Sequence, residues 1–126
     1  MKDVLLIDDN DAWKDVLKDI LNQFSDEHIN IISIKDGREG LDKYIEMKNS
    51  LREPKLTLVD QRLILIDGDR VIKDIKTKFP SANICGFTMY TEDKKANQRM
   101  VQSGARRVIP KSPHARRLAM DILEMM

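Results

Sequence analysis

Short apolar runs alternate with amphipathic segments along the whole chain. The runs are rich in valine, isoleucine and leucine, which is typical of buried strands, and they lie at residues 3–8, 29–34, 55–60, 83–88 and 106–109. Apolar residues at helical spacing follow each run and predict helices over residues 13–24, 41–48, 71–79, 92–103 and 113–126. Strands that alternate with helices favour an α/β fold, here a doubly wound five-stranded parallel sheet flanked by five helices. We expect one domain over residues 1–126.

The first predicted helix has the clearest apolar stripe. Its inward face is expected to carry Trp13, Val16, Leu17, Ile20, Leu21 and Phe24. Asn10 or Asp11 should cap its first turn, because a short polar side chain there can accept a hydrogen bond from a free backbone N–H. The last predicted helix should turn Leu118, Ile122 and Met125 inward.

The composition fits a soluble domain. Hydrophobic residues make up 41% of the chain, while the net charge of +1 gives no general reason for binding to nucleic acid or a membrane. The apolar runs are too short to span a bilayer, and the first residues enter a strand pattern, which predicts no signal peptide. The single cysteine, Cys85, excludes an internal disulfide. We therefore expect a cytoplasmic location.

Polar residues follow four of the predicted strands. Asp8 and Asp9 end the first, Asp60 ends the third, Thr88 ends the fourth and Lys111 follows the fifth. The carboxyl ends of parallel strands share one edge of a sheet, where ligands bind. Three carboxylates, a hydroxyl and an ammonium group should therefore meet in one pocket. Clustered carboxylates call for a hard cation such as Mg²⁺, and the other two groups suit phosphoryl oxygens.

In this order, these residues resemble the receiver domain of two-component response regulators. Gly68, eight residues after Asp60, and the segment Gly104–Lys111 also match the family's pattern, and the resemblance covers essentially the whole chain. It implies the flavodoxin-like (β/α)5 receiver fold. It also implies a phosphorylation-activated signalling switch rather than an enzyme, either as a stand-alone regulator or as a receiver cut from a longer response regulator or hybrid kinase.

The resemblance implies a role for each strand-end residue. Asp60 would accept the phosphoryl group, Thr88 would then bond one of its oxygens, and Lys111 would pair with another. Mg²⁺ would be held by Asp9, Asp60 and the backbone carbonyl of Arg62, with Asp8 acting mainly through water. The chemistry of the residues agrees, because a carboxylate can attack phosphorus in line when a divalent ion and a lysine offset the charge of the transferring group.

Several positions depart from the family's pattern. Val108 stands where an aromatic residue usually changes rotamer, and Tyr90 is the aromatic candidate to replace it. Met89 stands where a small residue is usual and could narrow access to the pocket. The usual lysine–proline pair is interrupted by Ser112, and a cis bond before a residue other than proline would cost about 3 kcal/mol. We therefore predict a competent phosphoacceptor with altered signal transmission.

Basic residues gather in the last part of the chain, where the charge from residue 91 onward is +4. This can be an ordinary solvated face, or a docking face for an acidic partner. The residues of this possible face include Lys94, Lys95, Arg99, Arg106 and Arg107. The family resemblance implies a histidine kinase or a histidine phosphotransfer protein as phosphodonor and an effector protein downstream, with no direct binding of nucleic acid.

Two other functions compete with the switch. A Mg²⁺-dependent phosphohydrolase could also work through an aspartyl phosphate, but such enzymes often place a second aspartate two residues after the nucleophile, and Arg62 stands there. A receiver that has lost phosphorylation and only binds proteins is the other alternative. The intact set of pocket residues argues against it.

Overall fold

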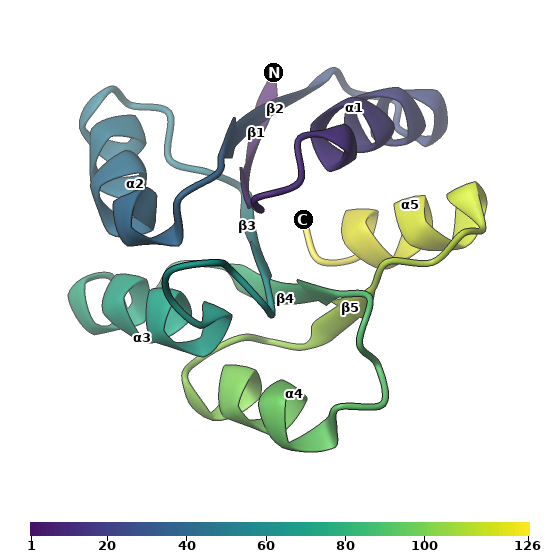
Figure 1. The fold of residues 1–126 in the computed structure, drawn as a ribbon. Coiled ribbons are helices and arrows are strands. Elements are labelled where there is room, and N and C mark those ends of the chain that lie inside the picture. Colours follow the sequence, from purple (N-terminus) through teal and green to yellow (C-terminus); the bar gives the residue numbers. More distant parts are fainter.

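The computed structural model describes all 126 residues, and its five strands form one sheet in the order β2-β1-β3-β4-β5 (Figure 1). The strands are β1 (Lys2–Ile7), β2 (Ile29–Ile34), β3 (Leu56–Asp60), β4 (Ile84–Thr88) and β5 (Val108–Pro110). Every neighbouring pair is parallel. The strand order reverses between β1 and β3, and in such sheets the crevice at a reversal opens at the carboxyl ends of the strands.

Helices cover both faces of the sheet. They are α1 (Ala12–Phe24), α2 (Gly40–Asn49), α3 (Gly68–Lys78), α4 (Lys94–Gln102) and α5 (Ala115–Leu123), with a short 3-10 turn at Gly37–Glu39. Figure 1 shows α1 and α5 together on one face and α2, α3 and α4 on the other. The predicted doubly wound fold is therefore confirmed. None of these helices is long and apolar enough to cross a bilayer.

The sheet is apolar on both faces because successive strand residues point in opposite directions. In β1, Val4 and Leu6 enter the core beneath α1 and α5, whereas Leu5 and Ile7 enter the core beneath the other three helices. In the first of these cores, Trp13 of α1 packs edge-on against Phe87 of β4, with ring centroids 5.4 Å apart. This contact anchors α1 over the carboxyl end of β4.

Several local predictions need correction. The sequence pattern turns Val16 inward, but its side chain is 40% exposed because it lies about 90° around α1 from the middle of the buried stripe. Of the two capping candidates, Asn10 accepts a bond from the Ala12 amide at 3.0 Å, whereas Asp11 makes no such bond. The first strand ends at Ile7, so that Asp8 follows it.

The C-terminal elements differ in extent from the pattern. The fifth strand is Val108–Pro110 rather than 106–109, and the last helix is Ala115–Leu123 rather than 113–126. Met125 packs against the core from beyond the helix end, and its carbonyl accepts a bond from Asn83 at 2.7 Å. All peptide bonds are trans, including the one between Lys111 and Ser112.

Candidate functional site

Three carboxylates meet where β1 and β3 end. Asp8 and Asp9 follow β1, and Asp60 is the last residue of β3, its neighbour in the sheet. One carboxylate oxygen from each lies within 4.8 Å of the others. Asp8 and Asp60 are buried, and Asp9 is half-buried. The sheet topology therefore brings together the three acidic residues that the sequence singles out.

Lys111 supplies the positive charge of this cluster. Its Nζ lies 2.7 Å from Oδ2 of Asp8 and 3.3 Å from Oδ1 of Asp60. The ammonium group is almost fully buried, and it lies 5.2 Å from the ring centre of Trp13 and 5.0 Å from that of Phe87. The two aromatic rings surround the buried ammonium group and leave little room for water. The attraction between Lys111 and the two carboxylates is therefore weakly screened.

The cluster holds more negative charge than Lys111 can balance. Burial raises the pKa of Asp60 to about 6, Lys111 opposes the rise, and the carboxylates of Asp8 and Asp9 add to it. Oδ2 of Asp8 is buried and accepts no well-directed hydrogen bond, although Nζ of Lys111 is close to it. Oxygen atoms with free lone pairs and excess negative charge are what a hard divalent cation requires, so these residues fit Mg²⁺.

The remaining predicted metal ligand is the backbone carbonyl of Arg62. This oxygen accepts no backbone hydrogen bond, and no side chain donates to it, so it is free to bind a cation. Arg62 and Asp67 form an isolated antiparallel bridge, which holds the two ends of the β3–α3 loop together. The loop therefore turns back directly after Asp60.

Thr88 ends β4 beside the acidic cluster. Its side chain is buried, and Oγ1 accepts a hydrogen bond from the backbone amide of Tyr90 at 2.8 Å. Its carbonyl accepts a bond from the amide of Lys111 at 2.8 Å. The strand ends of β4 and β5 are thereby tied together, which brings the hydroxyl-bearing and the ammonium-bearing residue to the same edge as Asp60.

Gly68 allows α3 to begin against the phosphoacceptor candidate. A Cβ atom at this position would lie 2.2 Å from the carbonyl oxygen of Asp60, far inside contact distance. The Gly68 amide donates to the carbonyl of Gln61 at 3.1 Å, which closes the loop. The match between this glycine and the family pattern thus has a steric cause.

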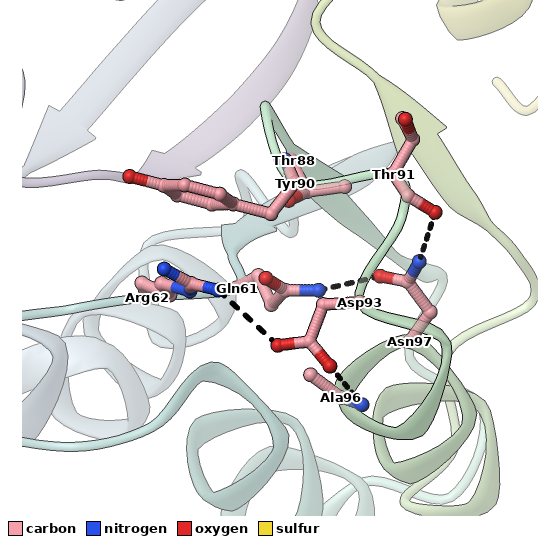
Figure 2. A network of polar contacts seen from close by, with 8 residues as sticks. All are labelled: Gln61, Arg62, Thr88, Tyr90, Thr91, Asp93, Ala96 and Asn97. Carbon is pink, nitrogen blue, oxygen red and sulfur yellow. Dashed lines mark hydrogen bonds and ion pairs between the residues drawn. The ribbon is translucent and has the colours of Figure 1, made fainter.

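Sequence reasoning missed a polar network beside the site (Figure 2). Nε2 of Gln61 donates to Oδ1 of Asn97 in α4 at 2.6 Å. The guanidinium of Arg62 pairs with Asp93 at 3.3 Å and stacks on the ring of Tyr90, 3.6 Å from its centre. No signal in the sequence indicates these pairs, because each depends on how α4 and the two loops pack against one another.

Only some of the side chains of the predicted basic face are exposed without a hydrogen-bond partner. Lys94, Lys95 and Arg99 are exposed on α4. Arg106 is also exposed, but its guanidinium donates to Asn83 and to the carbonyl of Met125, both at 3.1 Å. Both acceptors are uncharged, so Arg106 keeps its positive charge but is fixed in place, whereas the three basic side chains of α4 make no hydrogen bond.

Comparison with known proteins gives consistent matches. A model of the response regulator receiver domain matches residues 4–123. The chain is 29% identical over 110 residues to a protein-glutamate methylesterase/protein-glutamine glutaminase of Geobacter sulfurreducens, a match that covers 86% of this chain and 28% of that relative. The chain thus spans less than a third of the length of the curated relatives that it matches.

Solved structures share the fold. The response regulator domain of Thermotoga maritima CheB superposes with a TM-score of 0.78 at 27% identity, covering 98% of this chain and 92% of that one. The chemotaxis protein CheY4 of Vibrio cholerae superposes with a TM-score of 0.81 at 19% identity, covering 100% of this chain and 99% of that one. The second likeness concerns the fold alone.

Proposed function

This chain belongs to the response regulator receiver family, and we propose that it is a working phosphorylation switch whose phosphoacceptor is Asp60. The family acts in two-component signalling, with phosphorylation as its general switch. The observation that carries the proposal is the meeting of Asp8, Asp9 and Asp60 within 4.8 Å, with Lys111 beside them. All five strand-end residues of the family pattern are present.

In the proposed reaction, Asp60 is the nucleophile. One carboxylate oxygen forms a bond to phosphorus while the bond between phosphorus and the donor nitrogen breaks, and its electron pair stays on the imidazole of the donor. Lys111 holds its ammonium 3.3 Å from Asp60, where it can bond an oxygen of the incoming group. Thr88 can donate its hydroxyl proton to another oxygen of that group.

Receivers generally bind Mg²⁺ at an acidic pocket, and a bound Mg²⁺ supplies positive charge to the oxygens of the transferring group. In this chain we assign the ligands to Asp9, Asp60 and the carbonyl of Arg62, with Asp8 acting mainly through water. The acidic cluster and the carbonyl of Arg62, which accepts no hydrogen bond, support this assignment.

We propose a histidine kinase or a histidine phosphotransfer protein as the phosphodonor, and a cytoplasmic location in which the two meet. The downstream partner is proposed to be an acidic protein that docks on the exposed basic side chains of α4. Lys94, Lys95 and Arg99 support this choice, because opposite charges steer and orient association. Whether the chain acts alone or within a longer protein does not change the site.

The switch is favoured over a phosphohydrolase. Gln61 and Arg62 follow Asp60, and both are engaged with α4, so neither supplies the acid that fast turnover of an aspartyl phosphate needs. The intact cluster disfavours a receiver that only binds proteins.

A phosphate-release assay tests the choice. The protein is incubated with acetyl phosphate in the presence of Mg²⁺ or a chelator, and bound and released phosphate are counted per chain. A switch retains about one phosphoryl group per chain and releases phosphate slowly, whereas a hydrolase releases many in the same time. Neither a retained phosphoryl group nor released phosphate above the chelator sample would leave only the protein-binding alternative.

A further inference from the structure

The loop that follows Asp60 is joined side chain to side chain with α4. Gln61 bonds Asn97 at 2.6 Å, and the next residue, Arg62, pairs with Asp93 at 3.3 Å (Figure 2). Asp93 and Asn97 are four residues apart, so they lie on the same face at the start of α4. Two consecutive loop residues thus contact one stripe of the helix.

Packing continues this stripe toward Asp60. Met100, three residues after Asn97, is 1% exposed and fills the space above Gly86 and Gly68. Its Cε lies 3.1 Å from the place where a Cβ of Gly68 would be, and that same place is 2.2 Å from the carbonyl of Asp60. A shift of Asp60 or of its loop therefore meets α4 directly, because close-packed interiors transmit displacement.

The Gln61 contact is specific. Gln61 is 4% exposed, its Oε1 is buried without a partner, and its Nε2 is held by Asn97 alone. A buried amide that loses its one bond leaves both polar atoms unpaired, so its position is tied to that of α4. Asn97 in turn donates to the carbonyl of Thr91 at 3.3 Å, in the loop between Thr88 and the helix.

A second chain of contacts starts at Thr88. Its Oγ1 accepts from the Tyr90 amide at 2.8 Å, and the Tyr90 ring stacks on Arg62. Arg62 pairs with Asp93, which also caps α4 by accepting from the Ala96 amide at 3.2 Å. If Oγ1 of Thr88 turns toward a group on Asp60, the Tyr90 amide either follows it, which moves the stack on Arg62, or loses the bond that holds Tyr90.

We infer that the first turn of α4 responds to the phosphorylation state of Asp60 through two sets of contacts, which we call the two arms of a relay. One arm runs through Gln61 and Asn97. The other runs through Tyr90, Arg62 and Asp93. This inference rests on the proposed function. The relay takes the place of ring rotation at Val108, which has no ring to rotate. The same turn carries Lys94 and Lys95 on its exposed side, so its movement changes the presentation of the basic residues of α4.

Amide chemical shifts measured with and without beryllofluoride and Mg²⁺ test the relay. Beryllofluoride mimics a phosphoryl group on aspartate, and its bound ¹⁹F signal reports binding separately from any response of α4. The variants are Asn97→Ala and Gln61→Leu, which break the same hydrogen bond from opposite ends. Gln98→Ala is the matched control, because Gln98 is exposed on the same helix.

In the wild type and in Gln98→Ala, binding should shift the amides of residues 93–101. In Asn97→Ala and Gln61→Leu, beryllofluoride should still bind, but the shifts in α4 should fall to about half or less, because one arm remains. Binding with undiminished shifts of α4 in both variants would overturn the relay and leave the proposed function intact. Absence of binding to the wild type would overturn both.

Discussion

The guanidinium of Arg62 lies 3.6 Å from the centre of the Tyr90 ring, and this stack joins the loop after Asp60 to the loop after Thr88. Tyr90 is 39% exposed, and Arg62 also pairs with Asp93. The positive charge of Arg62 is thus held in place by two partners. The pair thus bridges the loops that follow β3 and β4, the strands that carry Asp60 and Thr88.

From the Arg62–Tyr90 stack we predict a long-lived aspartyl phosphate. Water must reach phosphorus on the line opposite the bond to Asp60, and two large side chains that hold each other can occupy this approach. We expect the double variant Arg62→Asn, Tyr90→Ala to lose its phosphoryl group about tenfold faster, which corresponds to about 1.4 kcal/mol of barrier. The measurement is the decay of the phosphorylated protein by intact mass. The control variant Arg116→Asn, at an exposed position of α5, should lose its phosphoryl group at the wild-type rate. If the double variant also decays at the wild-type rate, Arg62 and Tyr90 do not protect the aspartyl phosphate from water.

The acidic cluster predicts a pH-dependent gain in stability for Asp60→Asn. The pKa of Asp60 is raised to about 6 in the folded protein, chiefly by burial, and is about 3.9 in an unfolded chain. The folded state therefore binds the proton more tightly, and the wild type loses stability as the pH rises through this window. Asparagine does not titrate, so the variant should be more stable than the wild type by about 1–3 kcal/mol at pH 7.5 and about equally stable at pH 4.

Urea unfolding in the presence of a chelator measures this difference. Asp42→Asn, which changes an exposed aspartate of α2, serves as the control and should follow the wild type at both pH values. If Asp60→Asn gains no stability between pH 4 and pH 7.5, the excess negative charge assigned to the cluster is wrong.

Gly68→Ala should damage both stability and the site. The new methyl group would lie 2.2 Å from the carbonyl oxygen of Asp60, and a backbone atom cannot move aside as a flexible side chain can. We expect a loss of about 2 kcal/mol or more in the free energy of unfolding, together with slower phosphorylation. Arg70→Ala, two residues further in α3 and exposed, is the control. Wild-type stability of Gly68→Ala, measured by urea unfolding, would show that the loop can retreat without cost.

Tyr44 links α2 to the loop before β3. Its hydroxyl donates to Glu53 at 2.6 Å, a bond that lowers the pKa of Glu53, while burial first and then Glu53 raise the pKa of Tyr44. Tyr44→Phe should cost about 1 kcal/mol at pH 7. Because the folded pKa of Glu53 is depressed, its contribution is present above the unfolded pKa of about 4.3 and is lost as the pH falls through the folded value.

Thermal or urea unfolding of the wild type and of Tyr44→Phe at pH 7 and pH 3 measures this contribution to the free energy of unfolding. Tyr90→Phe removes the same hydroxyl from an exposed tyrosine, and it should change stability little. A cost of Tyr44→Phe that is the same at both pH values would contradict the role of the Glu53 carboxylate.

The clustering of the five strand-end residues can be predicted from the sequence, because the clustering depends only on the order and direction of the strands. Asp60 and Lys111 are 51 residues apart, yet parallel strands bring their ends to one edge whatever the details of the helices. The Gln61–Asn97 bond, across 36 residues, is different. It depends on how α4 is rotated about its axis, and a helix with only Ala96 and Met100 buried gives a weak pattern from which to predict that rotation.

The partners of charged side chains could not be predicted from the hydrophobic pattern either. Arg62 is exposed and shares a surface pocket with three aspartates, so its pairing with Asp93 and its stack on Tyr90 follow from tertiary packing alone. Val16 shows the same limit for apolar residues. Its spacing fits the helical stripe, but the buried face of α1 is narrower than the stripe and includes only Leu17, Ile20 and Leu21.

Site-resolved trapping of the phosphoryl group tests the central claim most directly. Wild-type protein is incubated with acetyl phosphate and Mg²⁺, reduced with borohydride, which converts an aspartyl phosphate to homoserine, and digested with trypsin. Residue 60 lies in the tryptic peptide of residues 56–62, between the cleavage sites at Lys55 and Arg62. We predict homoserine at position 60 in this peptide, and none after incubation with a chelator or in Asp60→Asn. An unmodified peptide, or homoserine at another aspartate, would contradict the assignment of Asp60 as the phosphoacceptor.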